Sequence, residues 1–409
     1  MNVLHVVGGD LSKGAFKGAF WLHEGLSASG VNSKICGFIP SHQTSETIST
    51  LSTSRTSILV NSLLQRQDAL WWLLYNRDRS AGFNAGLFGR KLDRYQDIKA
   101  FDIIHVHWGS NGVVNLPSIG RIDVPVVLTL RDMWFFTGGC HYSMSCERYT
   151  VGCGACPQLR SESNKDISFW LSRYKRKHLR NAKVNVVGIS DWLTECAQKS
   201  SVFNDAKVHT IYNCVDTHEF APFDKSLARD LLYIPQGRPI VLVGATNISS
   251  FYKGWEYFKE AVAKLGSEDV CIVTFGGARS IGELPSNINL KHLGYLQDEL
   301  SLRLAYCAAD VFVAPSVQEA FGKTLAESMA CGTPVVCFDA TGPASIVSHK
   351  VTGYKASPFS DEDLADGIKW VLDNRHSGSL RDACRERAIN CFSKEVIAQQ
   401  YINLYRSLL

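Results

Sequence analysis

One stretch, residues 306–337 (YCAADVFVAPSVQEAFGKTLAESMACGTPVVC), constrains the fold of this chain more than any other. Its apolar run over 309–315 predicts a short buried strand, residues 324–330 predict a helix, and residues 334–338 predict a second strand. A strand–helix–strand unit of this kind places a loop and a helix N-terminus at the carboxyl edge of a parallel sheet. Free backbone N–H groups and the helix dipole favour a phosphate there. The stretch therefore predicts an α/β fold with an anion site at this edge.

Two glutamates, Glu319 and Glu327, flank the predicted turn. With the E-A-F-G that opens it and the C-G-T-P-V-V that closes it, the stretch resembles the E-x7-E signature of the retaining glycosyltransferases of family 4. The resemblance implies the GT-B fold, in which two Rossmann-like domains face each other across a cleft. It also implies that Glu319 acts catalytically beside the donor sugar and that Glu327 binds the ribose of the nucleotide. The donor-binding residues that it implies between them are Phe321, Gly322, Lys323 and Thr324. The alternative is a pair of solvated surface glutamates on a Rossmann-like helix.

Size and composition are those of a globular protein with two domains. The chain has 409 residues, of which 45% are hydrophobic and 20% charged, enough for two cores. A net charge of +4 gives no argument for a nucleic-acid partner. The N-terminal residues lack the basic region of a signal peptide, and no apolar run is long enough to span a membrane, so we expect a cytoplasmic protein. We place the domains at 1–209 and 210–409, because residues 212–216 resemble the N-G-V-D near the interdomain linker of these enzymes.

The first predicted strand, residues 2–7, leads into a glycine-rich turn and a helix. The resemblance places Gly14 beside the donor phosphates, and Lys17 in the first helical turn adds positive charge there. A plain tight turn is the alternative, because the glycines form no complete dinucleotide-binding motif. We further expect a loop over 40–62, which is rich in Ser and Thr, and a helix over 63–79.

Two further strands, residues 101–108 and 124–130, end in His107 and in Arg131-Asp132. The carboxyl ends of parallel strands are where an active site belongs. Family members often carry a histidine at each of these two places. His107 fits the first, whereas Arg131 replaces the second. We therefore predict His107 and Asp132 as catalytic residues and Arg131 as a donor-binding cation that cannot take up a proton.

The second domain contains Lys253-Gly254 after the strand predicted over 239–244. In family 4 a lysine at this place binds the donor diphosphate, usually with an arginine five residues upstream. Ile248 occupies that upstream position. Lys253 is thus expected to act alone or with another cation, and the candidates are Lys323, Arg279 and Arg131. Gly276, at the end of the strand predicted over 271–277, is expected beside the nucleotide.

The segment 137–159 crowds four cysteines into a loop rich in Gly, Ser and Tyr. The C-x2-C end is typical of a knuckle that directs two thiolates at one metal. We predict a closed structural zinc site, with no catalytic cofactor, whose ligands are Cys140, Cys146, Cys153 and Cys156. Free thiols in a disordered insertion are the alternative. A similar insertion follows D-M-W-x-F-T-G-G-C-H-Y in a subgroup of family 4 enzymes of bacterial exopolysaccharide assembly, including the colanic-acid type.

A basic helix predicted over 168–183 begins with aromatic residues. Together with the Trp- and Arg-containing helix over 63–79, it suits a peripheral contact with an anionic membrane surface. Such a contact fits an acceptor carried on a polyprenyl diphosphate. The alternatives are a solvated basic helix and a helix packed on its own domain.

These features predict a retaining glycosyltransferase that moves a sugar from a GDP- or UDP-sugar to a glycan or a polyprenyl-diphosphate-linked acceptor in bacterial surface polysaccharide synthesis. The missing arginine at Ile248 and the substitution at Arg131 motivate an alternative, a catalytically degenerate GT-B protein that binds nucleotide sugars. A third class is an epimerase or phosphorylase of the same shape. No pyridoxal-phosphate lysine context supports the phosphorylase.

Overall fold

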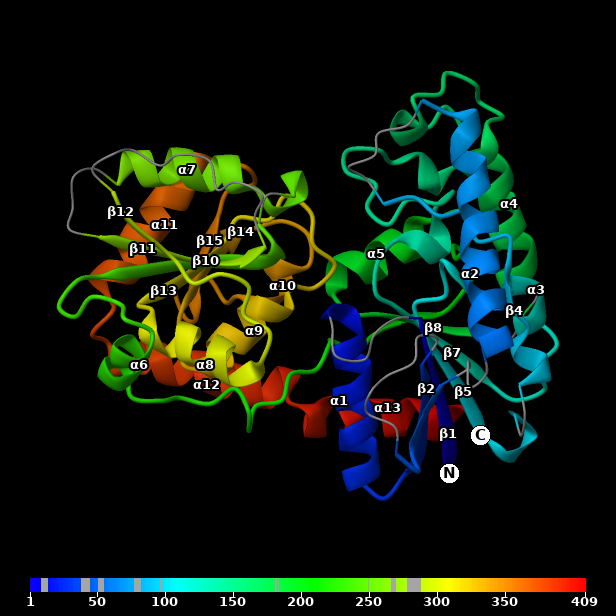
Figure 1. Cartoon of the computed structure of the whole chain (residues 1–409), viewed down its shortest axis with the longest axis horizontal. Coiled ribbons are helices and arrows are strands. Elements are labelled where there is room, and N and C mark those ends of the chain that lie inside the picture. The colour runs from blue at the N-terminus through cyan, green and yellow to red at the C-terminus, as the bar shows by residue number, and fades with distance from the viewer. Residues whose placement is uncertain are drawn as a thin grey trace. The chain divides into compact units, whose positions relative to one another are not determined.

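The computed structural model describes residues 1–8, 14–37, 45–50, 55–76, 82–95, 98–180, 182, 184–248, 250–265, 270–277 and 288–409. The chain forms two compact units (Figure 1). Unit 1 contains Met1–Tyr212 and Ile397–Leu409, and unit 2 contains Asn213–Val396. The predicted second domain extended to residue 409, whereas the last residues of the chain belong to unit 1.

The described sheet of unit 1 is parallel, with the strand order β3-β2-β1-β5-β7-β8-β9. Its strands are β1 (Asn2–Val7), β2 (Asn32–Gly37), β3 (Ile48–Thr50), β5 (Ile103–His107), β7 (Val126–Leu130), β8 (Val184–Gly188) and β9 (Val208–Thr210). A separate short pair joins β4 (Gly89–Arg90) to β6 (Gly112–Val114). The chain order reverses between β1 and β5, and ligands bind at such a point in open α/β sheets.

The helices in the described part of unit 1 connect these parallel strands, except for the last, which ends the chain. They are α1 (Gly14–Ala28), α2 (Arg55–Leu70), α3 (Leu116–Ile119), α4 (Ile167–Arg180), α5 (Asp191–Lys199) and the end of α13 (Lys394–Leu408). The loop predicted over 40–62 is wrong in part, because β3 and the first turns of α2 lie there. Ser and Thr disfavour helix interiors only weakly, so their abundance misled the prediction. The helix predicted over 63–79 ends earlier, at Leu70, and a 3₁₀ turn over Trp71–Leu74 follows it.

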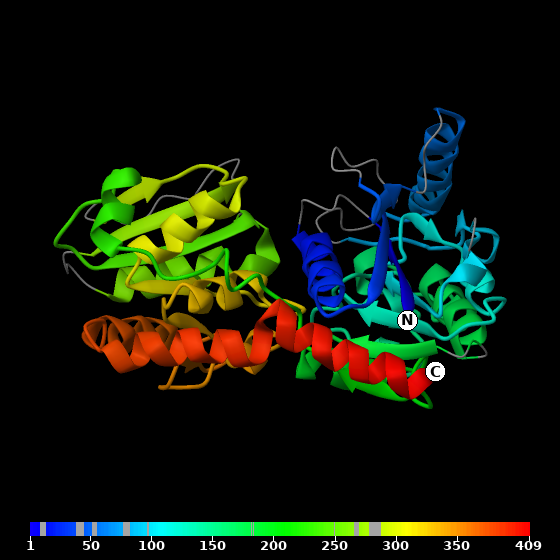
Figure 2. The ribbon, with the colours of Figure 1, turned by 90° about the horizontal axis from the view of Figure 1, so that it is seen from below.

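The C-terminal helix α13 packs against the sheet of unit 1 (Figure 2). The hydroxyl of Tyr405 lies 2.6 Å from His105 Nδ1 on β5. The hydroxyl of Tyr401 lies 2.8 Å from Thr129 Oγ1 on β7. All four side chains are buried, so hydrogen bonds between buried groups join the end of the chain to the middle of the sheet.

The described sheet of unit 2 is also parallel, in the order β12-β11-β10-β13-β14-β15. Its strands are β10 (Ile240–Asn247), β11 (Cys271–Gly277), β12 (Asn289–His292), β13 (Val311–Ala314), β14 (Val335–Phe338) and β15 (Gly353–Ala356). This is the 3-2-1-4-5-6 order of a Rossmann domain, with the reversal between β10 and β13. The strand–helix–strand unit predicted over 309–338 is thus confirmed as β13, α9 and β14.

Helices pack around this second sheet (Figure 1). They are α6 (Lys225–Leu231), α7 (Trp255–Lys264), α8 (Glu299–Ala308), α9 (Lys323–Ala330), α10 (Pro343–Ile346), α11 (Asp361–Asp373) and α12 (Gly378–Phe392). Asp310, which is 6% exposed and precedes β13, pairs with Lys225 and Arg229 of α6 at 2.7 and 2.8 Å. Its carboxylate also accepts the backbone N–H of Ile240 at 2.7 Å, so one buried charge connects α6 with two strands. None of the helices in the described residues is both long and apolar enough to cross a membrane.

Candidate active site

The loops after β10 and β13 enclose a pocket in unit 2. It lies where the strand order of this sheet reverses, the usual ligand position in such folds. The polar side chains that line it are those of Lys253, Ser316, Glu319 and Thr324. Lys253, predicted from one part of the sequence, therefore shares a pocket with Glu319 and Thr324, predicted from another. Ile248 also lines it, so the position at which the family resemblance predicted an arginine contributes an apolar surface here.

Lys253 and Glu319 form an ion pair in this pocket. Only 22% of the lysine side chain and 18% of the glutamate side chain are exposed. Burial by itself lowers the pKa of Lys253, but the adjacent Glu319 carboxylate more than offsets it, so the pKa is raised. The lysine is therefore fully protonated at neutral pH and carries a fixed positive charge into the pocket.

Two glycines allow the backbone of the pocket to pack as closely as it does. Gly254 has a φ of 71°, and a Cβ there would lie 1.8 Å from the carbonyl oxygen of Pro315. Gly276, the predicted nucleotide neighbour, has a φ of 117°, and a Cβ would lie 1.8 Å from the carbonyl oxygen of Ala245. Both φ values favour glycine. Gly276 therefore holds the end of β11 against the part of β10 that lines the pocket.

The loop that carries Glu319 is held by the segment after β14. The backbone N–H of Glu319 donates to Thr341 Oγ1 at 3.3 Å, and the backbone N–H of Gly342 donates to the Glu319 carbonyl at 2.9 Å. These bonds fix the backbone from which the Glu319 carboxylate projects toward Lys253.

The second glutamate of the signature, Glu327, lies on α9 and is only 1% exposed. Its Oε1 is 3.1 Å from Lys323 Nζ, and its Oε2 accepts the hydroxyl of Tyr306 at 2.9 Å. Burial, together with the nearby Glu327 charge, raises the pKa of Tyr306, which keeps the hydroxyl a donor. The structure thus pairs Glu319 with Lys253 and Glu327 with Lys323. The sequence prediction missed Tyr306, although it lies at the start of the signature stretch.

The turn before α9 combines a buried aromatic ring with a glycine. Phe321 is 2% exposed, and its ring packs edge-on against Phe392 with centroids 5.6 Å apart. Its predicted role at the donor therefore rests on its backbone. Gly322 precedes α9 with a φ of 105° and begins the helix whose first residues include Lys323 and Thr324.

In unit 1, Asp132 follows β7 and accepts three hydrogen bonds. They come from the backbone N–H of Trp134 at 2.8 Å, from Trp108 Nε1 at 2.8 Å and from His141 Nδ1 at 2.6 Å. His141 Nε2 lies 2.7 Å from Asn84 Oδ1. Asp132 and His141 therefore form a carboxylate–imidazole pair, with side chains that are 12% and 13% exposed. The sequence prediction missed His141, because it lies beside Cys140 in the segment assigned to metal binding.

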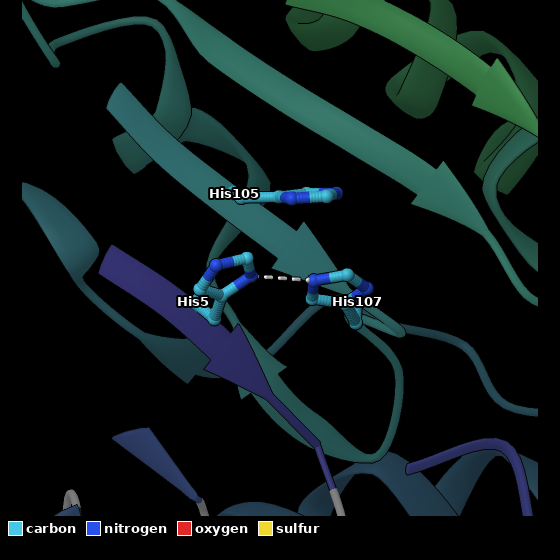
Figure 3. Close-up of side chains that lie close together, drawn as sticks. All are labelled: His5, His105 and His107. Atoms are coloured by element: carbon cyan, nitrogen blue, oxygen red, sulfur yellow. Dashed lines mark hydrogen bonds between the residues drawn. The ribbon is translucent and has the colours of Figure 1, made fainter. Parts of the chain in front are cut away.

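His107 is fully buried and belongs to a polar network inside the sheet (Figure 3). The guanidinium of Arg131 donates to His107 Nδ1 at 3.1 Å. His107 Nε2 therefore carries the proton and donates to His5 Nδ1 at 3.0 Å. Burial lowers the pKa of both imidazoles, and the Arg131 charge lowers it further, so both stay neutral. His107 thus accepts a hydrogen bond from the Arg131 guanidinium and orients it.

His5, His105 and His107 are the one set in the described residues that brings three metal-ligand atoms within 4.8 Å of one another. Both nitrogens of His105 lie 2.6 Å from hydroxyl groups, those of Tyr405 and Thr129. The Arg131 charge beside His107 opposes a second cation at this place. The three histidines are therefore best explained as a buried hydrogen-bond network that holds Arg131.

The remaining predicted residues lie elsewhere. Gly14 is the first residue of α1, and the Lys17 ammonium lies 5.7 Å from the centroid of the Trp21 ring. Arg279 lies outside the described residues. The four predicted zinc ligands line another pocket of unit 1.

Comparison with known proteins gives the family. Residues 22–219 match the family model described as Glycosyltransferase Family 4, and residues 235–390 match the model described as Glycosyl transferases group 1. The chain belongs to glycosyltransferase family 4. It is 27% identical to the glycosyltransferase MJ1607 of Methanocaldococcus jannaschii, over 76% of each chain. It is 23% identical to the colanic acid biosynthesis glycosyl transferase WcaC of Escherichia coli, over 80% of this chain and 82% of that one.

The solved structures confirm the predicted fold of this glycosyltransferase. Anabaena Alr3699/HepE, solved in complex with UDP, superposes with a TM-score of 0.64 at 18% identity over the whole of both chains. The same protein has also been solved with UDP-glucose. The two parallel sheets and this likeness establish an α/β protein of the GT-B fold.

Proposed function

We propose that this family 4 glycosyltransferase transfers a sugar, with retention of its anomeric configuration, from a nucleotide-diphosphate sugar to a glycan or a polyprenyl-diphosphate-linked acceptor. The ion pair between Lys253 and Glu319 at the strand-order reversal of unit 2 carries the proposal. The UDP and UDP-glucose complexes of HepE support a UDP-sugar as the first donor class to test, with GDP-sugars next. The name of WcaC supports surface polysaccharide synthesis as the setting.

The chemistry requires stabilisation of a leaving diphosphate and of an electron-poor sugar carbon. Lys253 supplies a positive charge for the first, together with the N-terminal backbone amides of α9 that follow Gly322. Glu319 supplies a carboxylate that stabilises the electron-poor sugar carbon. When the diphosphate binds Lys253, the carboxylate is released from its ion pair and becomes available to orient the sugar.

Unit 1 would contribute Asp132 and Arg131 toward the acceptor side. The hydrogen bond from His141 to Asp132 provides an imidazole next to the carboxylate, an arrangement suited to proton transfer. His107 acts as a positioning residue through its bond to Arg131. An arginine in this place suits recognition of phosphate on an acceptor.

A groove on unit 1 supports a peripheral membrane contact. It has a volume of about 500 Å³, and its aromatic lining consists of Trp71, Tyr75, Trp170 and Tyr174. Trp170 is 57% exposed. The exposed basic residues of α4 nearby are Arg173, Arg176, Lys177 and Arg180. Lys175, which the sequence placed in this cationic cluster, is fully buried instead, since its ammonium donates to the backbone carbonyl of Thr137 at 3.1 Å.

An aromatic groove beside basic side chains suits an anionic lipid surface, with each exposed cation adding about 1 kcal/mol. We expect the protein to float with vesicles that contain phosphatidylglycerol and not with neutral vesicles. Trp170→Ala should weaken that binding. Equal flotation of wild type and variant would refute the groove as the contact.

The decisive experiment measures sugar release from radiolabelled UDP- and GDP-sugars with purified protein and a polyprenyl-diphosphate acceptor. Glu319→Gln should lower turnover at least about 100-fold, the typical effect of losing one transition-state interaction, while nucleotide binding persists. Glu362→Gln, at an exposed position of α11, is the matched control. Nucleotide binding without turnover in wild type, under every acceptor tried, would favour a degenerate binding protein. Full turnover in Glu319→Gln would refute the proposed role.

A further inference from the structure

Four free cysteines of unit 1 line one pocket in the segment between β7 and α4. They are Cys140, Cys146, Cys153 and Cys156, and Arg148 and Tyr149 lie among them. The pocket has a volume of about 20 Å³. One water-sized body needs roughly 10–15 Å³ on this measure, so the pocket has room for a single ion rather than for a larger cluster.

The backbone around Cys153 has the form of a metal knuckle. Four consecutive residues have positive φ, namely 112° at Gly152, 60° at Cys153, 99° at Gly154 and 43° at Ala155. Each non-glycine residue in this conformation costs roughly 1–2 kcal/mol, so the surrounding structure must hold it. The backbone N–H of Gly138 donates to Cys153 Sγ at 3.1 Å, a bond that favours the thiolate form.

The start of α4 supports the same knuckle. Asp166, which is 4% exposed, accepts the backbone N–H of Cys156 at 2.8 Å, and Ser168 Oγ accepts that of Gly154 at 3.0 Å. A Cβ on Gly154 would lie 2.3 Å from the carbonyl oxygen of Asn164. Buried polar groups therefore fix the backbone at Gly154 and Cys156, as the surroundings of a metal site do.

The charges near the pocket suit thiolates bound to a metal. The buried Lys175 ammonium lies close enough to Cys153 to interact electrostatically with its sulfur, and Arg148 lines the pocket. A Zn²⁺ ion with four thiolates carries a net charge of −2. Lys175 and Arg148 place two positive charges close to it, which offsets that charge without a further ligand.

We propose that Cys140, Cys146, Cys153 and Cys156 bind one Zn²⁺ ion, and that this ion holds His141 in position to pair with Asp132. His141 follows Cys140 directly, and its imidazole reaches the carboxylate at 2.6 Å. The main chain adds to this support, since Met133 N–H donates to the His141 carbonyl at 3.0 Å. A metal bound at Cys140 would therefore fix one end of the pair formed by His141 and Asp132.

Zinc binding requires the four sulfur atoms to come closer to one another than they are in this structure. No three of these four sulfurs, all of which are described, lie within 4.8 Å of one another. Tetrahedral zinc with bonds of about 2.3 Å needs sulfur atoms about 3.8 Å apart. Rotation of the cysteine side chains can close the set, and deprotonation of the four thiols makes the affinity rise with pH.

The test is the metal content of the full chain purified without chelators, measured by plasma mass spectrometry. We expect about one zinc per chain, and a cobalt-exchanged sample with the visible spectrum of a four-thiolate site. Cys146→Ser should lose most of the metal. Cys391→Ser, a partly exposed cysteine in unit 2, should keep it. A metal-free wild type with four thiols that react with Ellman's reagent would overturn the proposal, as would iron in place of zinc.

Hydrogen exchange tests the link to His141 without an activity assay. Removal of zinc by a chelator should raise exchange in peptides that cover 137–159 and leave those of α12 in unit 2 unchanged. Unchanged exchange over 137–159 after complete zinc loss would show that the ion does not position His141. Neither the zinc content nor the hydrogen exchange depends on the donor or the acceptor. Failure of the zinc proposal can therefore be distinguished from failure of the proposed function.

Discussion

Lys253→Met is the most informative single change, because it removes the fixed positive charge of the proposed donor pocket and keeps most of the side-chain volume. A charge-assisted hydrogen bond contributes about 1.5–3 kcal/mol, which corresponds to about a 10–150-fold change in Kd. The lysine pairs with Glu319 in the free protein, and breaking that pair offsets part of the gain on binding. We therefore expect nucleoside diphosphate binding to weaken by about tenfold, measured by calorimetry with UDP and GDP.

The same change also affects stability. Glu319 would lose its partner while only 18% of its side chain is exposed. The cost lies between those of surface and fully buried pairs, at about 1–3 kcal/mol. The double variant Lys253→Met with Glu319→Gln should recover much of this stability, because no charge is left alone, but it should not recover nucleotide affinity.

Lys264→Met is the matched control. Lys264 ends α7, is 45% exposed and pairs with Asp361 at 2.8 Å, so both its stability and binding effects should be small. Unchanged nucleotide affinity in Lys253→Met would refute the assignment of the pocket. An equal loss of nucleotide affinity in Lys264→Met would show that the effect comes from the overall charge of the protein.

Three further predictions concern stability, each measured by urea unfolding. Gly276→Ala should lower the free energy of unfolding by more than 3 kcal/mol, since positive φ and a 1.8 Å contact with β10 act together. Gly237→Ala, also at positive φ but with nothing within 4 Å, should cost about 1 kcal/mol, and equal losses would contradict the contact argument. Asp310→Asn should cost about 3–5 kcal/mol at pH 7, because the buried Arg229 and the partly buried Lys225 lose their partner. Burial acts to raise the pKa of Asp310, but the two cations and a backbone N–H outweigh it and the pKa is lowered. The contribution of Asp310 is thus complete above about pH 4 and is lost as pH falls through the lower folded value, so the difference between variant and wild type should shrink only in acid. Tyr405→Phe should cost about 1–3 kcal/mol, because His105 Nδ1 loses its hydroxyl partner in the core, and a change below 0.5 kcal/mol would argue against that bond.

Much of the pocket that contains Lys253 and Glu319 could be predicted from the sequence. The strands of both sheets follow from short apolar runs, because a buried parallel strand needs such a run whatever surrounds it. Parallel strands end at a common edge, so Lys253 after β10 and Glu319 after β13 could be expected in one pocket despite a sequence separation of 66 positions. Gly276 could likewise be placed at this edge, since it lies near the end of β11, the neighbour of β10.

The partners of individual side chains could not be predicted, because they depend on contacts between distant segments. The basic pattern of α4 placed Lys175 on a charged surface, whereas packing against Trp134 buries it completely. Spacing placed His107 at the end of a strand but gave no sign of His5, which lies on the adjacent strand β1.

Sequence alone therefore determined the family, the parallel sheets and the sheet edge at which the pocket of Lys253 and Glu319 lies, since these follow from local apolar periodicity and from residues close together in the chain. Tertiary structure alone decided that Glu327 accepts the hydroxyl of Tyr306 and that His141 pairs with Asp132. The physical reason is that a buried polar group takes whichever partner the packed fold brings within hydrogen-bond distance.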